Sequence, residues 1–457
     1  EVDLEVIELF RQCKKENKSK DEFLRLASHI KGVYVPSLYD VTYNNDGTIK
    51  EFKPKFDDVP QKIEKRVMMD MDSSYYPDNF VVPFVEVVHD RVVHEIFRGC
   101  IRGCRFCQAG FSCRPVRKKS ADVLYRQAVE TLENSGHNEI TLSSLSTSDY
   151  RQLRELTDDM IPYCADNKIN LSVPSLRADN FSRELMQKLQ TLRKSGLTFA
   201  PEAGSQRLRD VINKGLTEEV ILNGAREAFK GGWNRVKLYF MLGLPTETEA
   251  DMRGIAELSN EIAKVYYDTV PKEERKGKVQ IVTSTSFFIP KPFTPFQWAR
   301  MSTKEEFLDK ARVVKTAVTE QLNQKSIKYN WHEADVSVLE GVFARGDRKL
   351  CKVIETAWKN GCTFDSWDDK FKYDTWMDAF KECGINTEFY ANRRRSYDEV
   401  LPWDHINSGI SKEFLIKENE KAKKAETSKH CREQCNACGS NKLNGGKCDA
   451  LSKNMVH

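Results

Sequence analysis

Cysteine thiols are the side chains of this sequence that point most directly to chemistry. The chain has 457 residues and 13 cysteines, and eight of these cysteines fall in two tight clusters. The first cluster contains Cys100, Cys104, Cys107 and Cys113, and the second contains Cys431, Cys435, Cys438 and Cys448. Disulfide frameworks belong to short secreted chains with an even number of cysteines, so clustered thiols in a long chain indicate metal sites in a reduced protein.

The first cluster has the spacing of three ligands that leave one metal position open. Cys100, Cys104 and Cys107 follow the pattern CxxxCxxC in a glycine-flanked loop. Three thiolates can hold three corners of a cubane iron–sulfur cluster and leave the fourth iron without a protein ligand. Catalytic metal sites keep such an open position, whereas structural sites are closed. A zinc site with Cys113 as the fourth ligand is the structural alternative.

The same loop is rich in arginine. Arg98, Arg102 and Arg105 alternate with the cysteines. We expect their positive charge to lie beside an anionic thiolate–iron site and to tune its potential.

The second cluster repeats the CxxxCxxC spacing, and Cys448 follows ten residues after Cys438. Four sulfur ligands can close a tetrahedral zinc or single-iron site, or they can hold an auxiliary iron–sulfur cluster. A tail without metal is the third interpretation, and the sequence leaves all three open.

The elements that must position these thiols alternate between strands and helices. Apolar segments predict six strands, at 87–97, 139–145, 170–174, 197–200, 236–242 and 279–288. Amphipathic patterns predict helices at 121–134 with Ser120 as the N-cap, at 182–195 and at 218–230. This alternation is typical of parallel βα units, and six units predict an α/β fold with a partial, TIM-like (βα)6 barrel. Loops that follow the strands converge on one face of such a barrel.

Four regions are expected along the chain. Residues 1–79 are predicted to form helices up to residue 30, a hairpin at 41–49 and a linker. The partial barrel is expected at 80–300, a helical domain at 301–416, and a polar tether with a Cys-rich metal-binding tail at 417–457.

Composition excludes several classes of protein. Apolar residues make up 40% and charged residues 31% of the chain, which is a globular composition. The formal charge of +4 does not indicate a surface that coats nucleic acid. No run of 18 apolar residues is present, so no membrane partner is expected. No signal peptide opens the chain, and we expect a cytoplasmic protein.

The cysteine motif at the end of the first strand of a βα series resembles the radical S-adenosylmethionine (SAM) superfamily. The resemblance implies that Cys100, Cys104 and Cys107 hold a [4Fe-4S] cluster whose free iron binds SAM. An electron donor such as flavodoxin or ferredoxin supplies one electron, which cleaves SAM to methionine and a 5′-deoxyadenosyl radical. The radical abstracts hydrogen from a substrate that the sequence does not identify.

The resemblance also implies cofactor-binding residues at the ends of the strands. Phe106 borders the adenine, and the loop with Ser144 and Ser146 stands where many members have Gly-Gly-Glu for the methionine amino group. This serine-rich loop departs from that pattern, and an ordinary turn is its alternative. The other implied residues are Ser172 at the ribose, Arg177 at the carboxylate, Glu202 at the ribose or methionine, and Gly243, Leu244 and Pro245 beside the adenine. A surface ion pair is the alternative for Arg177.

Several phrases resemble one subgroup of this superfamily, the uncharacterised members with an N-terminal cobalamin-binding-like domain. The phrases include YVPSLYDV at 34–41, CIRGCRFCQAG at 100–110 and SFFIPKPFTPFQW at 286–298. No Asp-x-His-x-x-Gly motif is present, and the chain begins at Glu1 rather than Met. We therefore expect the cobalamin-like domain to be missing upstream, with cobalamin a cofactor only through that domain.

Two other functions fit the motifs. The wording CxRGCxFC is also found in methylthiotransferases, so methyl or methylthio transfer to RNA is an alternative reaction. A non-catalytic, zinc-dependent RNA-binding or interaction protein, with both clusters as zinc modules, is the alternative of another class. Such a protein would be colourless, whereas an iron–sulfur enzyme would be brown.

Overall fold

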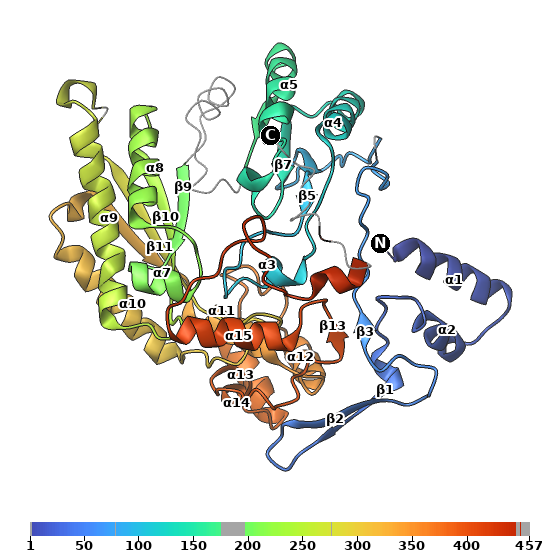
Figure 1. Ribbon diagram of the computed structural model, residues 1–457. Helices are drawn as coiled ribbons and strands as arrows, with labels where there is room; N and C mark the ends of the chain where they lie inside the picture. The colour runs from blue at the N-terminus through green and yellow to red at the C-terminus, as the bar shows by residue number, and fades with distance from the viewer. Residues whose placement is uncertain (1, 78, 175–196, 276, 445–447, 449–457) are drawn as a thin grey trace.

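The computed structural model describes residues 2–77, 79–174, 197–275, 277–444 and 448 (Figure 1). Near the N-terminus, helices α1 (Asp3–Lys15) and α2 (Lys20–Ala27) precede an antiparallel hairpin of β1 (Tyr39–Tyr43) and β2 (Ile49–Pro54). The Ser19 side chain accepts a hydrogen bond from the Glu22 backbone N–H and so caps α2. The predicted N-terminal helices and hairpin are therefore confirmed.

Seven parallel strands form two sheets (Figure 1). The first sheet has the order β4-β7-β8 and the second has the order β12-β11-β10-β9. The strands are β4 (Val92–Glu95), β7 (Glu139–Ser143), β8 (Asn170–Ser172), β9 (Leu197–Glu202), β10 (Arg235–Leu242), β11 (Gln280–Phe287) and β12 (Ile327–Trp331). Spatial order follows chain order in both sheets, which is the arrangement of successive βα units. Among the described residues no strand pairing joins the two sheets, and no closed barrel forms.

Helices follow the strands as the sequence predicts. They are α4 (Ala121–Ser135), α5 (Leu153–Asp166), α7 (Gln206–Val211), α8 (Glu218–Lys230), α9 (Glu249–Thr269) and α10 (Lys304–Thr319). The hydroxyls of Ser120, Thr217 and Thr303 accept backbone N–H groups at the starts of α4, α8 and α10. The predicted helix at 182–195 lies outside the described residues.

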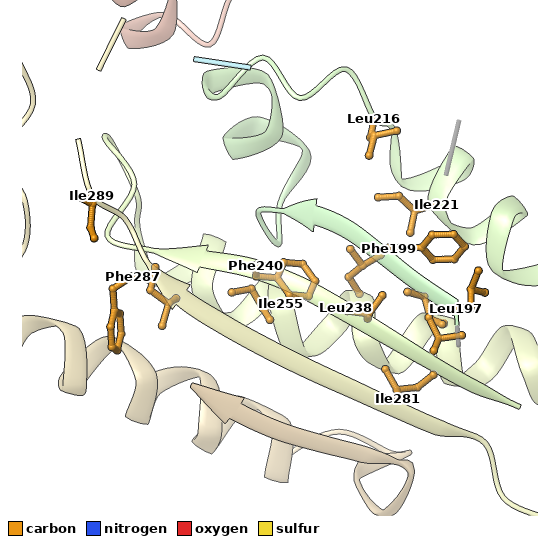
Figure 2. Close-up of a cluster of buried hydrophobic side chains, with 14 of the residues drawn as sticks. Leu197, Phe199, Leu216, Ile221, Leu238, Phe240, Ile255, Ile281, Phe287 and Ile289 are labelled. Carbon is orange, nitrogen blue, oxygen red and sulfur yellow. The ribbon is translucent and has the colours of Figure 1, made fainter. Parts of the chain in front are cut away.

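The core lies between the second sheet and its helices (Figure 2). Leu238 and Phe240 of β10 are almost fully buried and point toward the side on which Ile255 of α9 packs. Side chains alternate along a strand, so Lys237 and Tyr239 face the other side of the sheet, where they are partly exposed. Apolar burial on one face thus fixes the sheet against the helices and leaves the opposite face for polar groups.

All six predicted strands are present, with two differences from the prediction. The predicted strand 87–97 contains β4 and β5 (Phe97–Arg98), whereas residues 87–91 are not strand, and Val88 is 89% exposed. Strand β12 is a seventh parallel strand that lies within the region predicted to be helical. The sheet therefore continues past residue 300, while the three boundaries between the predicted regions stay a prediction.

The C-terminal region is mostly helical. It contains α11 (Ala334–Arg345), α12 (Leu350–Lys359), α13 (Tyr373–Glu382), α14 (Thr387–Ala391) and α15 (Lys412–Lys423). Short pairings join β3 (Ile63–Glu64) to β13 (Ile406–Asn407), and β5 to β6 (Arg117–Lys118). The predicted tether from residue 417 is wrong at its start, because residues up to Lys423 belong to α15 and Ala422 is buried. No described helix has both the length and the apolar character needed to cross a bilayer.

Candidate metal and cofactor site

Cys100, Cys104 and Cys107 of the first cluster lie in the loop between β5 and α3 (Gln108–Ser112), just beyond the C-terminal end of β4, and Cys113 directly follows α3. Gly99 opens this loop with a φ of 88°, and a Cβ there would stand 2.9 Å from the Cys113 carbonyl oxygen. Only glycine fits such a turn. The Cys107 backbone N–H donates to the Cys104 carbonyl oxygen at 3.0 Å. Tight turns therefore gather the three thiols in one short segment.

Burial disfavours the charged thiolate form of the cysteines in this loop. Burial, with a further contribution from Cys104 and Cys107, raises the pKa of Cys100 to about 12. Burial and the nearby Cys104 also raise the pKa of the Cys107 thiol. A bound metal removes the cost of burying a thiolate, because it stabilises the thiolate form. The Arg102 backbone N–H donates to Cys100 Sγ at 3.4 Å, which also favours the thiolate.

The three thiols are the donor set that a cubane cluster with one open position requires. A [4Fe-4S] cluster can take one thiolate at each iron, so three thiolates leave the fourth iron without a protein ligand. Three thiols in one short, partly buried loop are therefore consistent with the [4Fe-4S] assignment.

The loop arginines lie in the same short segment as the cysteines, and their effect on the potential of the site stays a prediction. Each of them forms an ion pair with a carboxylate, and this pairing offsets its charge. The pairs are Arg98 with Glu95 at 2.9 Å, Arg102 with Asp149 at 2.6 Å, and Arg105 with Glu418 at 3.0 Å.

Arg105 connects the cysteine loop to two segments that are distant in the sequence. Its backbone N–H donates to the Ile212 carbonyl oxygen at 2.9 Å, and its side chain donates to the Val211 carbonyl oxygen at 2.9 Å. It also donates to the Glu426 carbonyl oxygen at 2.7 Å and pairs with Glu418 of α15. In Figure 1, α15 crosses the molecule below α3 and beside α7. The guanidinium is fully buried and joins all three segments.

The loop after β7 carries the two predicted serines. Ser144 Oγ and Thr147 Oγ1 are 2.9 Å apart, and Ser146 Oγ donates to Asp149 Oδ2 at 2.6 Å. Asp149 also accepts two hydrogen bonds from the Arg102 side chain, which brings this loop against the cysteine loop. Both serine hydroxyls are thus engaged within their own loop, and their contact with the cofactor stays a prediction.

Glu202 and Lys214 form an ion pair beside Phe106 and Cys107. Lys214 Nζ lies 3.1 Å from Glu202 Oε1 and 5.9 Å from the centroid of the Phe106 ring. Lys214 acts to lower the pKa of the Cys107 thiol and Glu202 acts to raise it, so both charges lie near this sulfur. Glu202 ends β9 with a φ of 69°, a strained conformation of the kind found at functional sites. The structure therefore brings Glu202 and Phe106 together with the cysteine loop.

The Gly243–Leu244–Pro245 turn after β10 lines a separate cavity of about 750 Å³. Gly243 has a φ of 86°, and a Cβ there would stand 2.8 Å from the Phe307 ring. Leu244 packs in an apolar cluster that Phe106 borders, so this turn and the cysteine loop share one hydrophobic contact region. The three cysteines are not among the described residues that line the cavity.

The two remaining predicted residues lie at the end of β8. Ser172 is the last residue of this strand and is partly exposed. Arg177 lies outside the described residues.

The second cysteine cluster packs directly against the first. The Cys431 backbone N–H donates to the Ile101 carbonyl oxygen at 3.0 Å, and the Arg432 side chain donates to the Asp149 carbonyl oxygen. One small cavity is lined by Cys100 and Arg114 together with Cys431, Cys435, Cys438 and Cys448. The sequence predicts both clusters but does not predict that they touch.

Several residues of the site were missed by sequence reasoning. Asn213 Nδ2 donates to the Gly103 carbonyl oxygen at 3.1 Å, while Asn213 Oδ1 accepts the Ser428 backbone N–H at 2.8 Å. Lys214 directly follows Asn213 in the chain. The sequence feature that could have identified both residues is their position shortly after the Glu202 segment. Arg114 and Glu418 carry no comparable signal, because their contacts join segments far apart in the chain.

Comparison with known proteins identifies the domain that contains these loops. Residues 94–259 match the family model of the radical SAM superfamily. The chain therefore carries a radical SAM domain, which supports an enzyme of this class and confirms the resemblance seen in the cysteine motif. This family implies a [4Fe-4S] cluster and SAM as cofactors.

Each of the individual relatives matches this chain over only part of its own length. An uncharacterised protein of Methanocaldococcus jannaschii, MJ0966, is 35% identical over 57% of this chain and 53% of that protein. The ribosomal protein uS12 methylthiotransferase RimO of Thermotoga maritima is 23% identical over 60% of this chain and 66% of that protein. The chain thus spans about half to two thirds of these curated relatives.

Solved structures are less similar. The radical SAM coproporphyrinogen III oxidase HemN of Escherichia coli has a TM-score of 0.35 at 13% identity, over 50% of this chain and 52% of that one. Such a similarity carries no argument about function.

Proposed function

We propose that this chain is a radical SAM enzyme that cleaves SAM reductively with a [4Fe-4S] cluster held by Cys100, Cys104 and Cys107. The observation that carries the proposal is the placement of these thiols, within the matched domain, in a partly buried loop at the end of β4. When bound, the cluster passes one electron to SAM, and the resulting 5′-deoxyadenosyl radical abstracts hydrogen from a substrate yet to be identified. A flavodoxin or ferredoxin is the expected electron donor.

In this proposal the protein positions the cofactors and shields the site from water. Arg105 and Asn213 fix the cysteine loop through hydrogen bonds, so the open metal position is held in place before SAM binds. Phe106 offers an aromatic edge for the adenine, and Glu202 offers an acceptor for ribose hydroxyls or for the methionine amino group. Lys214 forms an ion pair with Glu202 and thereby fixes the position of its carboxylate.

The remaining strand ends complete the proposed SAM site. Ser144, Ser146, Ser172 and Arg177 are proposed for the polar groups of the cofactor, and Gly243, Leu244 and Pro245 for the adenine. The apolar cluster of Leu244, Ala203 and Phe288 lies next to Phe106. This cluster keeps water from one side of the proposed radical site.

Anaerobic reconstitution tests the proposal. The protein should turn brown, and dithionite with SAM should release 5′-deoxyadenosine. Cys104→Ala should abolish this release, whereas the matched variant Cys351→Ser, an exposed thiol on α12, should retain it. A fully reconstituted protein that releases no 5′-deoxyadenosine would overturn the enzymatic proposal. Colourless protein with two bound zinc ions would favour the non-catalytic interaction protein instead.

Methyl or methylthio transfer to RNA is the second candidate function. The transfer reaction is favoured by the similarity to the ribosomal protein uS12 methylthiotransferase over 60% of this chain, although that relative acts on a ribosomal protein and not on RNA. The second set of thiols beside the first also fits a reaction that needs an additional sulfur-bearing centre. Comparison of modified nucleosides and metabolites from cells with and without the protein distinguishes this reaction from hydrogen abstraction on a metabolite.

A further inference from the structure

The small cavity between the two cysteine clusters is lined by cysteines of both. Cys431, Cys435, Cys438 and Cys448 of the tail line it, and Cys100 of the first cluster lines it as well. The contact is also made by the backbone, through the hydrogen bond from Cys431 to Ile101. Four thiols separated by up to 17 residues in the tail thus meet at one place, against the loop proposed to hold the first cluster.

Arg114 is the charged group of this cavity. Its side chain is only 4% exposed, and its Nε has no hydrogen-bond partner among the described residues. One of its Nη atoms donates to the Arg102 carbonyl oxygen at 2.8 Å, and Arg114 lines the cavity together with Cys438. No carboxylate of the described residues forms an ion pair with it. A buried guanidinium requires negative charge nearby, and thiolates are the groups here that can provide it.

We infer that the four tail cysteines hold a second iron–sulfur cluster, docked on the first cysteine loop, with Arg114 as the counter-charge shared by both centres. Four thiolates around a cluster carry net negative charge, which matches the buried guanidinium. The tail sulfurs line one cavity together with Cys100, so a centre that they hold would lie against the first cysteine loop.

Metal content tests this inference apart from any activity. Wild-type protein reconstituted anaerobically should hold about eight iron atoms per chain, as two four-iron clusters require. The variant with all four tail cysteines changed to Ser should hold about four, and so should the variant with Cys100, Cys104 and Cys107 changed to Ala. Cys351→Ser should match the wild type. Circular dichroism confirms that each variant is folded.

The outcomes separate this inference from the proposed function. If the tail variant keeps the iron content of the wild type, or if the tail holds zinc, the second cluster is refuted, while 5′-deoxyadenosine release can still support the proposed function. If the tail variant loses about half of the iron but no 5′-deoxyadenosine forms in the wild type, the second cluster stands and the proposed function fails.

Arg114 provides a sharper test of the shared counter-charge. Arg114→Met removes the positive charge, so reduction should become harder at both centres and both midpoint potentials should fall. Arg114→Lys keeps the charge and should largely restore both potentials. Electron paramagnetic resonance during redox titration resolves the two centres. A fall at only one centre, or at neither, would refute the shared role of Arg114.

Discussion

Arg105 and Glu418 stand 313 positions apart in the sequence, yet they form an ion pair whose side chains are 0% and 4% exposed. The pair joins the cysteine loop to α15, so the C-terminal region holds the candidate site in place. A buried pair leaves an uncompensated charge when one partner is removed, and the cost is then about 3–5 kcal/mol. Glu418→Gln should therefore lower the free energy of unfolding by roughly this amount, measured by chemical denaturation.

A matched control separates burial from charge pairing in general. Lys359 and Glu355 form an ion pair in which both side chains are 61% exposed. Lys359→Ala should change the free energy of unfolding by less than about 1 kcal/mol. Equal losses in the two variants would contradict a special role for the Arg105–Glu418 pair.

Asp149 is expected to control how well the first loop retains its metal. It is buried and accepts hydrogen bonds from Arg102 and Ser146, and Arg102 is also bonded through its backbone to Cys100. Asp149→Asn leaves the Arg102 charge without its carboxylate and loosens the two loops. We expect less iron retained after gel filtration than in the wild type.

An exposed carboxylate serves as the comparison for Asp149. Asp158 lies on α5 and pairs with Arg154 at the surface at 3.8 Å. Asp158→Asn should retain iron as the wild type does. Iron retention in Asp149→Asn that equals that of Asp158→Asn would show that the Arg102 contact does not support the metal loop.

Local patterns in the sequence predicted the scaffold well. Strands such as β10 have a clear alternation of buried and exposed residues, and α8 begins and ends where its amphipathic pattern places it. The cysteine loop was placed at the end of a strand by motif alone, and the structure puts it there. These features depend on neighbours in the chain, which a single sequence contains.

The long-range contacts of the site could not be predicted. The length of β12 is typical of an edge strand, but only its pairing with β11 shows that it extends the sheet. The polar segment after residue 416 has the composition of a tether, and its helix is stabilised by the burial of Glu418 against Arg105. The role inferred for Arg114 likewise depends on the tail thiols beside it, which lie far away in the sequence. Such contacts depend on which distant segments meet, and local composition does not contain that information.

The Glu202–Lys214 pair is expected to act on SAM rather than on the metal. Lys214→Met leaves the Glu202 carboxylate without its partner, beside Phe106 and close to Cys107. We expect 5′-deoxyadenosine release to fall by roughly tenfold or more, the loss of one charged contact of about 1.4 kcal/mol. Iron content should stay at the wild-type level, because neither residue is a proposed ligand.

The control for Lys214 is a surface lysine in a comparable pair. Lys230 contacts Glu227 at the end of α8, and both side chains are well exposed. Lys230→Met should release 5′-deoxyadenosine at the wild-type rate. If Lys214→Met instead lost iron, the pair would support the cysteine loop and would not be a cofactor contact.

His94 makes the stability of the protein depend on pH. Its ring is fully buried in β4 and lies 2.8 Å from the Tyr76 hydroxyl, and burial lowers its pKa from 6.5 to about 4. Below pH 6.5 the unfolded chain binds a proton at this histidine and the folded chain does not, so stability falls as the pH falls toward 4. The full loss is on the order of 3 kcal/mol. Above pH 6.5 this residue adds no pH dependence.

Replacement of His94 tests this linkage directly. His94→Gln removes the titrating group, so the difference in unfolding free energy between pH 7 and pH 5 should be smaller than in the wild type. Burial also lowers the pKa of His405 to about 4, so His405 should preserve part of the dependence of stability on pH in this variant. His89→Gln changes an exposed ring and should keep the wild-type slope. An unchanged slope in His94→Gln would show that His94 already takes up a proton in the folded protein above pH 5, and that its buried position in β4 does not keep the ring neutral.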